Sequence, residues 1–222
     1  MKILVTGCAG FIGFNLIRDI AKNKKNLIIG IDNINNYYSV ALKKKRLSIL
    51  NKSNNFQFQK IDFSKLNILN KLFKKNKFDI IIHLGAQAGV RYSISNPEKY
   101  FDSNLSGFFN ILDLSKKYKV KHLIFASTSS VYGDTEKFPL KESFDTSRPL
   151  SFYAATKKAN EVMAHSYSYL HNIPITALRF FTVYGPFGRP DMSLYKFTEA
   201  INDNKKIDLY NYGKHIRDFT YV

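Results

Sequence analysis

Three glycines, Gly7, Gly10 and Gly13, follow a short apolar run at the start of the chain. In a strand–loop–helix unit, the first glycine permits a tight turn, the second leaves room for a pyrophosphate, and the third lets the helix pack closely on the sheet. The helix N-terminus then presents free N–H groups to the phosphates. Asp32, at the end of the next predicted strand, can accept hydrogen bonds from ribose hydroxyls and would repel a 2′-phosphate. The pattern predicts an NAD site; the alternative is an ordinary glycine turn beside a surface aspartate.

A second pattern pairs Tyr153 with Lys157, four positions apart on a predicted helix. Side chains at this spacing share a helix face. A lysine ammonium beside a phenol favours the phenolate and lowers the pKa of the tyrosine from its usual value near 10. A tyrosine tuned in this way can act as a general base and acid toward an alcohol. This spacing also arises by chance in a chain with 14 tyrosines. It indicates a catalytic pair only because it occurs in the same chain as, and downstream of, a predicted dinucleotide-binding loop.

Hydroxyl groups gather in the segment Ser127–Gly133, which follows another predicted strand. In an open parallel sheet, ligands bind at the carboxyl ends of the strands. The hydroxyls can therefore hydrogen-bond a substrate and join a proton relay. The alternative is a helix cap or a plain turn.

Short apolar runs alternate with amphipathic segments along the chain. The runs are continuous rather than alternating, as expected for strands buried on both faces. The predicted strands are Lys2–Thr6, Leu27–Ile31, Phe56–Ile61, Asp79–His83, His122–Ala126 and Ile175–Phe180. One helix face is predicted from Phe101, Leu105, Phe108 and Leu112, and another from Leu66, Leu69 and Leu72.

This alternation predicts an α/β fold, a Rossmann-type doubly wound parallel sheet with helices on both faces. We expect residues 1–185 to form the NAD-binding domain with the catalytic residues. After Pro186, a loop, a helix near Ser193–Ile201 and a short β pair ending at Val222 indicate the beginning of a smaller C-terminal substrate-binding region, 186–222.

The chain carries 34 basic and 17 acidic residues, a formal net charge of +17. Such a charge is typical of nucleic-acid binding or of a lysine-rich solvated surface. We favour the second interpretation, because the lysines are scattered and no nucleic-acid motif accompanies them. No apolar run approaches the length of a membrane span, and the N-terminus lacks a signal-peptide pattern. Cys8 is the single cysteine and cannot form an internal disulfide, which agrees with a reducing, cytoplasmic location. From the charge pattern and the lack of a membrane span we expect no nucleic-acid partner and no membrane partner.

Longer blocks extend these motifs along the whole chain. They are Gly30–Asn33, Tyr37–Tyr38, Leu42–Lys43, His83–Arg91, Asp102–Gly107, Ser151–Glu161, Arg179–Pro186 and Gly188–Met192. On these blocks the chain resembles the extended short-chain dehydrogenase/reductase enzymes, the NAD-dependent epimerases and dehydratases. Within them it is most similar to the UDP-glucuronate 4-epimerases.

The resemblance implies a role for individual residues. Thr128, Tyr153 and Lys157 would be the catalytic trio. The residues that would hold NAD are Gly7, Gly10, Phe11, Ile12, Gly13, Asp32, Asp62, Ala86, Asn104 and Lys157. The residues that would face the UDP-sugar are Ser129, Ser130, Thr182 and Arg189. No metal is implied, and a homodimer would pack through the helices near Pro97–Tyr118 and Ser151–His171.

The implied reaction inverts C4 of a UDP-sugar by transient hydride transfer to bound NAD, most simply UDP-glucuronate to UDP-galacturonate. Related 4,6-dehydratases carry Asp-Glu after the catalytic threonine, and UDP-glucuronate decarboxylases carry a glutamate just before Val-Tyr-Gly. Ser129 and Ser130 stand at those positions here, so both alternatives lose weight. A UDP-galactose 4-epimerase remains an alternative.

A hypothesis of another class is a truncated, inactive NAD-binding or RNA-associated protein on the same fold. The family pattern continues beyond the motif Arg217–Val222 into a further segment, so we expect this chain to be C-terminally truncated.

Overall fold

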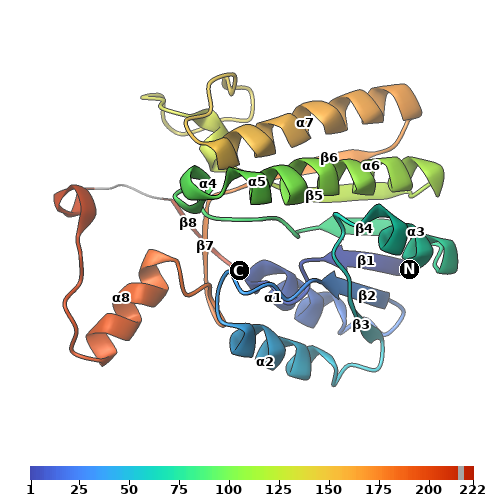
Figure 1. The fold of residues 1–222 in the computed structure, drawn as a ribbon, viewed down its shortest axis with the longest axis horizontal. Helices are drawn as coiled ribbons and strands as arrows, with labels where there is room; N and C mark the ends of the chain where they lie inside the picture. Colours follow the sequence, from blue (N-terminus) through green and yellow to red (C-terminus); the bar gives the residue numbers. More distant parts are fainter. Residues whose placement is uncertain (215–217) are drawn as a thin grey trace.

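The computed structural model describes residues 1–214 and 218–222. Arg217, the first residue of the C-terminal motif, lies outside the described residues. A six-stranded parallel sheet in the order β3-β2-β1-β4-β5-β6 forms the frame of the molecule (Figure 1). Its strands are β1 (Lys2–Thr6), β2 (Leu27–Asp32), β3 (Phe56–Lys60), β4 (Ile80–His83), β5 (His122–Thr128) and β6 (Ile175–Phe180). The positions of all six predicted strands are confirmed, with ends that differ by two residues at most. The expectation of burial on both faces is wrong for β3 and β6, because these strands form the two edges of the sheet and are partly exposed.

Helices follow the strands in turn. They are α1 (Phe11–Ile20), α2 (Val40–Leu50), α3 (Leu66–Lys75), α4 (Tyr92–Ser95), α5 (Pro97–Tyr100), the π-helical turn η1 (Phe101–Ser106), α6 (Gly107–Lys117), the 3₁₀ turn η2 (Ser129–Tyr132), α7 (Phe152–His171), α8 (Ser193–Asn202) and the 3₁₀ turn η3 (Tyr210–Gly213). Side-chain caps and turn residues set their ends. The Ser151 hydroxyl accepts a hydrogen bond from the Ala154 N–H at 3.1 Å and starts α7, and Asn172 ends it in the left-handed conformation.

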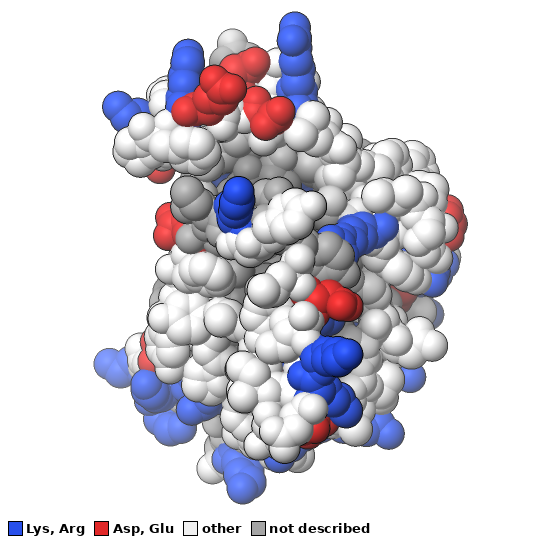
Figure 2. All heavy atoms as spheres, turned by 90° about the vertical axis from the view of Figure 1, so that its left-hand side faces the viewer, with Lys and Arg blue, Asp and Glu red and all other residues white. Residues whose placement is uncertain are grey.

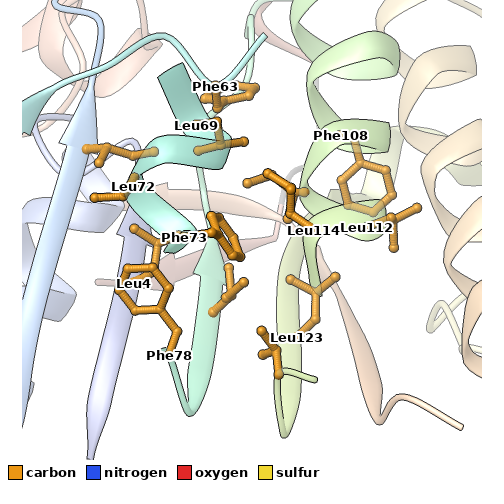
Figure 3. Close-up of a cluster of buried hydrophobic side chains, with 14 of the residues drawn as sticks. Leu4, Phe63, Leu69, Leu72, Phe73, Phe78, Phe108, Leu112, Leu114 and Leu123 are labelled. Carbon is orange, nitrogen blue, oxygen red and sulfur yellow. The ribbon is translucent and has the colours of Figure 1, made fainter. Parts of the chain in front are cut away.

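Two apolar clusters hold the helices on opposite faces of the sheet. Along β1, Leu4 joins the cluster shared with α3, α6 and α7, whereas Ile3 and Val5 join the cluster shared with α1 and α2. This alternation follows from the two-residue period of a strand. Figure 3 shows the first cluster, in which Leu69 of α3 and Phe108 of α6 lie over the sheet. Full burial of one such side chain contributes about 1.5–3 kcal/mol.

The helix predicted around residue 105 differs from expectation. Phe108 and Leu112 are buried, but Phe101 is 54% exposed and Leu105 is only half-buried. The prediction of a single face through all four residues was wrong, because η1 is a π-helical turn, whose wider turn shifts the pattern. Tyr100 is buried in place of Phe101.

The C-terminal residues add a second, small sheet. β7 (Thr182–Tyr184) pairs in parallel with β8 (Phe219–Tyr221), and α8 lies at the left-hand end of the molecule in Figure 1. The predicted β pair thus includes a strand that precedes residue 186. The boundary between 1–185 and 186–222 stays a prediction. In the described residues no helix is both long and apolar enough to cross a bilayer.

Candidate active site

The strand order reverses between β1 and β4, which places the loops after these two strands on either side of a crevice. Gly7 has a φ of +69°, and a Cβ there would lie 2.7 Å from the Gly85 nitrogen, so the two loops approach closely. The Gly10 N–H donates to the Gly7 carbonyl at 2.9 Å. The turn delivers the chain into α1, whose first N–H groups have no partner within the helix and are available to an anion.

Most residues predicted to hold the cofactor line this crevice. They are Gly7, Gly10, Phe11, Ile12, Gly13, Asp32 and Ala86. The three others, Asp62, Asn104 and Lys157, are not among the lining residues. The arrangement fits a dinucleotide, because the loop leaves no room for a side chain at Gly10: a Cβ there would lie 2.9 Å from the Gly7 carbonyl oxygen. Without that side chain, the backbone of the loop can approach a pyrophosphate closely.

Asp32 lies at the end of β2 with both carboxylate oxygens engaged. Oδ2 accepts a hydrogen bond from the Ala9 N–H at 3.2 Å, and Oδ1 accepts one from the Ile34 N–H at 2.8 Å. Burial raises the pKa of Asp32, while these hydrogen bonds and the charge of Lys43 oppose the rise. Asp32 therefore organises the glycine loop in addition to facing the crevice.

Asp62 and Asn104 are hydrogen-bonded to neighbours that line the crevice, Asn33 and Gln87. Asp62 accepts a hydrogen bond from the Asn33 side chain at 3.1 Å. The Asn104 amide binds both backbone groups of Gln87, at 2.8 and 3.1 Å, and donates to Thr156 at 3.1 Å. Direct contact of either residue with NAD stays a prediction.

The crevice also contains residues that received no site role from the sequence, although most of them lie within the motif blocks. These additional lining residues are Asn33, Asn35, Tyr37, Tyr38, Lys43, Phe63, Leu84, Gly85, Gln87, Ala88, Ser103 and Ala126. Several belong to the loop directly after Asp32, a position that could have marked them.

The three residues predicted to be catalytic come from two elements, with Thr128 at the end of β5 and Tyr153 and Lys157 on α7. Lys157 is 2% exposed, and its Nζ donates to the Ala126 carbonyl at 2.9 Å. Burial lowers the pKa of Lys157 to about 8, so the ammonium is mostly charged at neutral pH. Since Ala126 lines the crevice, Lys157 holds the backbone of a residue that the cofactor would contact.

Tyr153 is affected by other groups than expected. Burial raises the pKa of Tyr153 above its ordinary value of 10, while a hydrogen bond with Thr128 and the charge of Arg189 act in the opposite direction. The predicted lowering by Lys157 is wrong for this structure, because the lysine head is directed at Ala126 instead of the phenol. The cation that acts on the tyrosine here is Arg189.

The residues expected to face the substrate are brought together in part. Ser130 lies next to Thr128, whose hydroxyl donates to the Ser130 hydroxyl at 3.2 Å, and Ser129 is on the same turn, η2. Arg189 lines the crevice and is paired with Asp191, which also accepts a hydrogen bond from Tyr37 at 3.1 Å. Thr182 begins β7, where its N–H donates to the Asp218 carbonyl at 3.2 Å.

The strand order, the glycine loop and the acidic end of β2 define a Rossmann-type dinucleotide-binding domain. Residues 3–222 match the model of the NAD dependent epimerase/dehydratase family, and the chain belongs to this family.

Two relatives and one solved structure are similar to this chain over its length. It is 53% identical over 222 residues to "Protein CapI" of Staphylococcus aureus and covers 66% of that protein. It is 45% identical over 219 residues (99% of the chain) to the UDP-glucuronate 4-epimerase of Thermodesulfobacterium geofontis and covers 67% of it. Among solved structures, the UDP-glucuronic acid 4-epimerase of Bacillus cereus in complex with UDP-glucuronic acid and NAD is 36% identical, with a TM-score of 0.93. The whole chain is covered in that comparison, and 69% of the Bacillus cereus chain.

Proposed function

We propose that the chain is the cofactor-binding and catalytic part of an NAD-dependent epimerase that converts UDP-glucuronate to UDP-galacturonate. The observation that carries this proposal is the pair Ser129 and Ser130 beside Thr128, across from Tyr153, at the carboxyl end of a Rossmann sheet. The names of the Thermodesulfobacterium geofontis and Bacillus cereus relatives support the substrate.

NAD would lie in the crevice between the loops after β1 and β4. When bound, it supplies the hydride acceptor and donor that the inversion of an alcohol carbon requires. Phe11, Ile12 and Gly13 would offer N–H groups to the pyrophosphate, and Asp32 would meet the ribose hydroxyls and disfavour a 2′-phosphate.

Tyr153 would take the proton of the sugar 4-hydroxyl and return it after the sugar has turned over. Burial raises the pKa of Tyr153, while its hydrogen bond with Thr128 and the charge of Arg189 oppose the rise and support the ionised form that proton removal needs. A 4-keto uronate is a β-keto acid, which loses carbon dioxide readily when its carboxylate is poorly held. Ser129 and Ser130 can donate hydrogen bonds that keep the carboxylate away from that alignment.

The partners of the Glu161 carboxylate, which is hydrogen-bonded to Ser127 at the end of β5, support an epimerase over a dehydratase. Glu161 accepts hydrogen bonds from the Ser127 hydroxyl at 2.6 Å and from two Arg179 nitrogens at 2.9 Å. Although burial acts to raise the pKa of Glu161, these partners hold it below its ordinary value. Glu161 therefore stays ionised and engaged, and it does not supply the acid that water elimination needs.

Product analysis by NMR tests the proposal. The chain is incubated with UDP-glucuronate and NAD, alone and fused to the part of the Staphylococcus aureus relative that it does not cover. We expect UDP-galacturonate with little UDP-pentose, and no reaction when NADP replaces NAD. Predominant UDP-pentose would identify a decarboxylase. Conversion of UDP-glucose alone would identify a neutral-sugar epimerase, and no turnover in either form would refute the assignment as an enzyme.

We also propose that the protein is cytoplasmic and binds no nucleic acid. Cys8 is free and buried, as suits a reducing compartment. Figure 2 looks onto the side of the molecule on which α8 lies, and on this face Lys and Arg are separated by uncharged residues instead of forming a continuous basic band.

We propose a homodimer that packs through α6 and α7, because these helices expose apolar side chains. Phe109 is 47%, Val162 58% and Leu170 64% exposed. The helices lie side by side (Figure 1), with the Phe109 and Tyr167 rings 6.3 Å apart. We expect Val162→Glu to convert a dimer into a monomer in light scattering, because it buries a charge in the interface. Ile68→Glu on α3, also exposed, serves as the control; a monomeric unsubstituted chain would contradict the proposal.

A further inference from the structure

Arg46 is a buried cation in the middle of α2. Its relative exposure is 0%, and among the described residues no carboxylate lies within ion-pair distance. Asp32 lies beyond ion-pair distance but is within reach of the Arg46 charge, which acts to lower the pKa of Asp32. Among the residues that the structure describes, the Arg46 Nε has no hydrogen-bond partner. A desolvated guanidinium is costly unless its N–H groups are used well, so the contacts of the other nitrogens indicate its role.

The two terminal nitrogens reach different parts of the chain. Nη1 donates to the Ala9 carbonyl at 2.8 Å and to the Tyr38 hydroxyl at 2.7 Å. Nη2 donates to the Phe187 carbonyl at 2.7 Å and to the Gly188 carbonyl at 3.2 Å. The rigid fork of a guanidinium can hold such separate acceptors at one fixed spacing. Arg46 therefore joins the glycine loop to the segment after β7.

At the glycine loop, Arg46 orients a single peptide unit. The Ala9 carbonyl points to the guanidinium, while the N–H of the same peptide, from Gly10, donates to the Gly7 carbonyl at 2.9 Å. This peptide immediately precedes α1. Its orientation determines how the first N–H groups of the helix face the crevice.

At the other end, Arg46 supports a strained loop. Phe187 has a φ of +60°, which is unusual for a residue with a side chain and persists only where the surroundings hold it. Its ring packs on Phe14 at 4.9 Å, and the Pro186 carbonyl accepts a hydrogen bond from Asn15 at 3.1 Å. Gly188 is followed directly by Arg189, which lines the crevice and donates a hydrogen bond to Asp191 two residues further on.

We propose that Arg46 is a positioning residue that couples the cofactor loop to the segment Pro186–Met192. Ordering of the glycine loop by NAD holds the Ala9 carbonyl on the guanidinium. The guanidinium in turn holds the Phe187 and Gly188 carbonyls and presents Arg189 to the substrate. The inference rests on the proposed function only in taking NAD as the molecule that binds the crevice.

Amide hydrogen exchange, read by mass spectrometry with and without NAD, tests this coupling without any sugar nucleotide. In the unsubstituted chain we expect NAD to slow exchange in residues 7–13 and also, by about tenfold, in residues 186–192. In Arg46→Met, saturating NAD should still slow exchange in 7–13 but leave 186–192 nearly unchanged. Lys45→Met, which removes an exposed charge from the same helix, should behave like the unsubstituted chain.

A third variant keeps the test valid if Arg46→Met does not fold. Phe187→Asn removes the ring from Phe14 but keeps the carbonyl that Arg46 holds, and asparagine tolerates the left-handed conformation. NAD should still slow exchange in 186–192 of this variant. Loss of that protection, or its persistence in a folded Arg46→Met, would overturn the coupling while leaving the epimerase assignment standing. Absence of protection in 7–13 of the unsubstituted chain would overturn NAD binding as well.

Discussion

Tyr153→Phe is expected to lower the rate of C4 inversion by about 10²–10⁴-fold while leaving NAD affinity nearly unchanged. The substitution removes only the phenolic hydroxyl, whose pKa is raised by burial against the opposing effects of the Thr128 hydrogen bond and the Arg189 charge. The ring, whose centroid lies 6.1 Å from that of Tyr100, keeps its packing. NMR of the UDP-sugar products gives the rate, and calorimetric titration gives the NAD affinity.

A tyrosine on the same helix supplies the control. Tyr169 is 80% exposed near the end of α7, so Tyr169→Phe should retain the full rate. Inversion by Tyr153→Phe at a rate close to that of the unsubstituted protein would remove Tyr153 from proton transfer. A parallel loss of NAD affinity would assign it a structural role instead.

Gly13→Ala is expected to lower the free energy of unfolding by at least about 1–3 kcal/mol and to abolish measurable NAD binding. A Cβ at this position would collide with the Gly7 carbonyl oxygen and lie 3.2 Å from the Cys8 Cα. Both obstacles are backbone, so α1 must move away from the sheet and take its N–H groups out of the crevice. Urea unfolding and calorimetric titration measure the two effects.

Gly188→Ala is a matched glycine substitution for the stability measurement. A Cβ there would lie 3.2 Å from the Gly185 carbonyl oxygen, a tight contact on a surface segment, so we expect a smaller loss of unfolding free energy. Equal stability of Gly13→Ala and the unsubstituted chain would show that the close helix–strand contact is not required.

The local sequence determined the fold and the location of the cofactor crevice. Nearly continuous apolar runs predicted the inner strands β1, β2 and β4, because a parallel strand buried on both faces has few polar positions. The edge strand β3, which reads Phe-Gln-Phe-Gln-Lys, alternates apolar and polar residues instead. The glycine spacing and Asp32 were equally local signals, since a tight turn and a close helix need particular residue types at fixed positions. Those residues line the crevice.

Only the tertiary structure decided which charged groups meet. Lys157 is four residues from Tyr153 on one helix, yet its head reaches Ala126 on β5, and the cation acting on the phenol is Arg189 from a distant loop. Arg46 has no recognisable sequence motif, because its acceptors are backbone carbonyls of two separate segments. Backbone atoms are the same in every residue, so such contacts arise from the packing of α2 against both loops and leave no signal in the sequence.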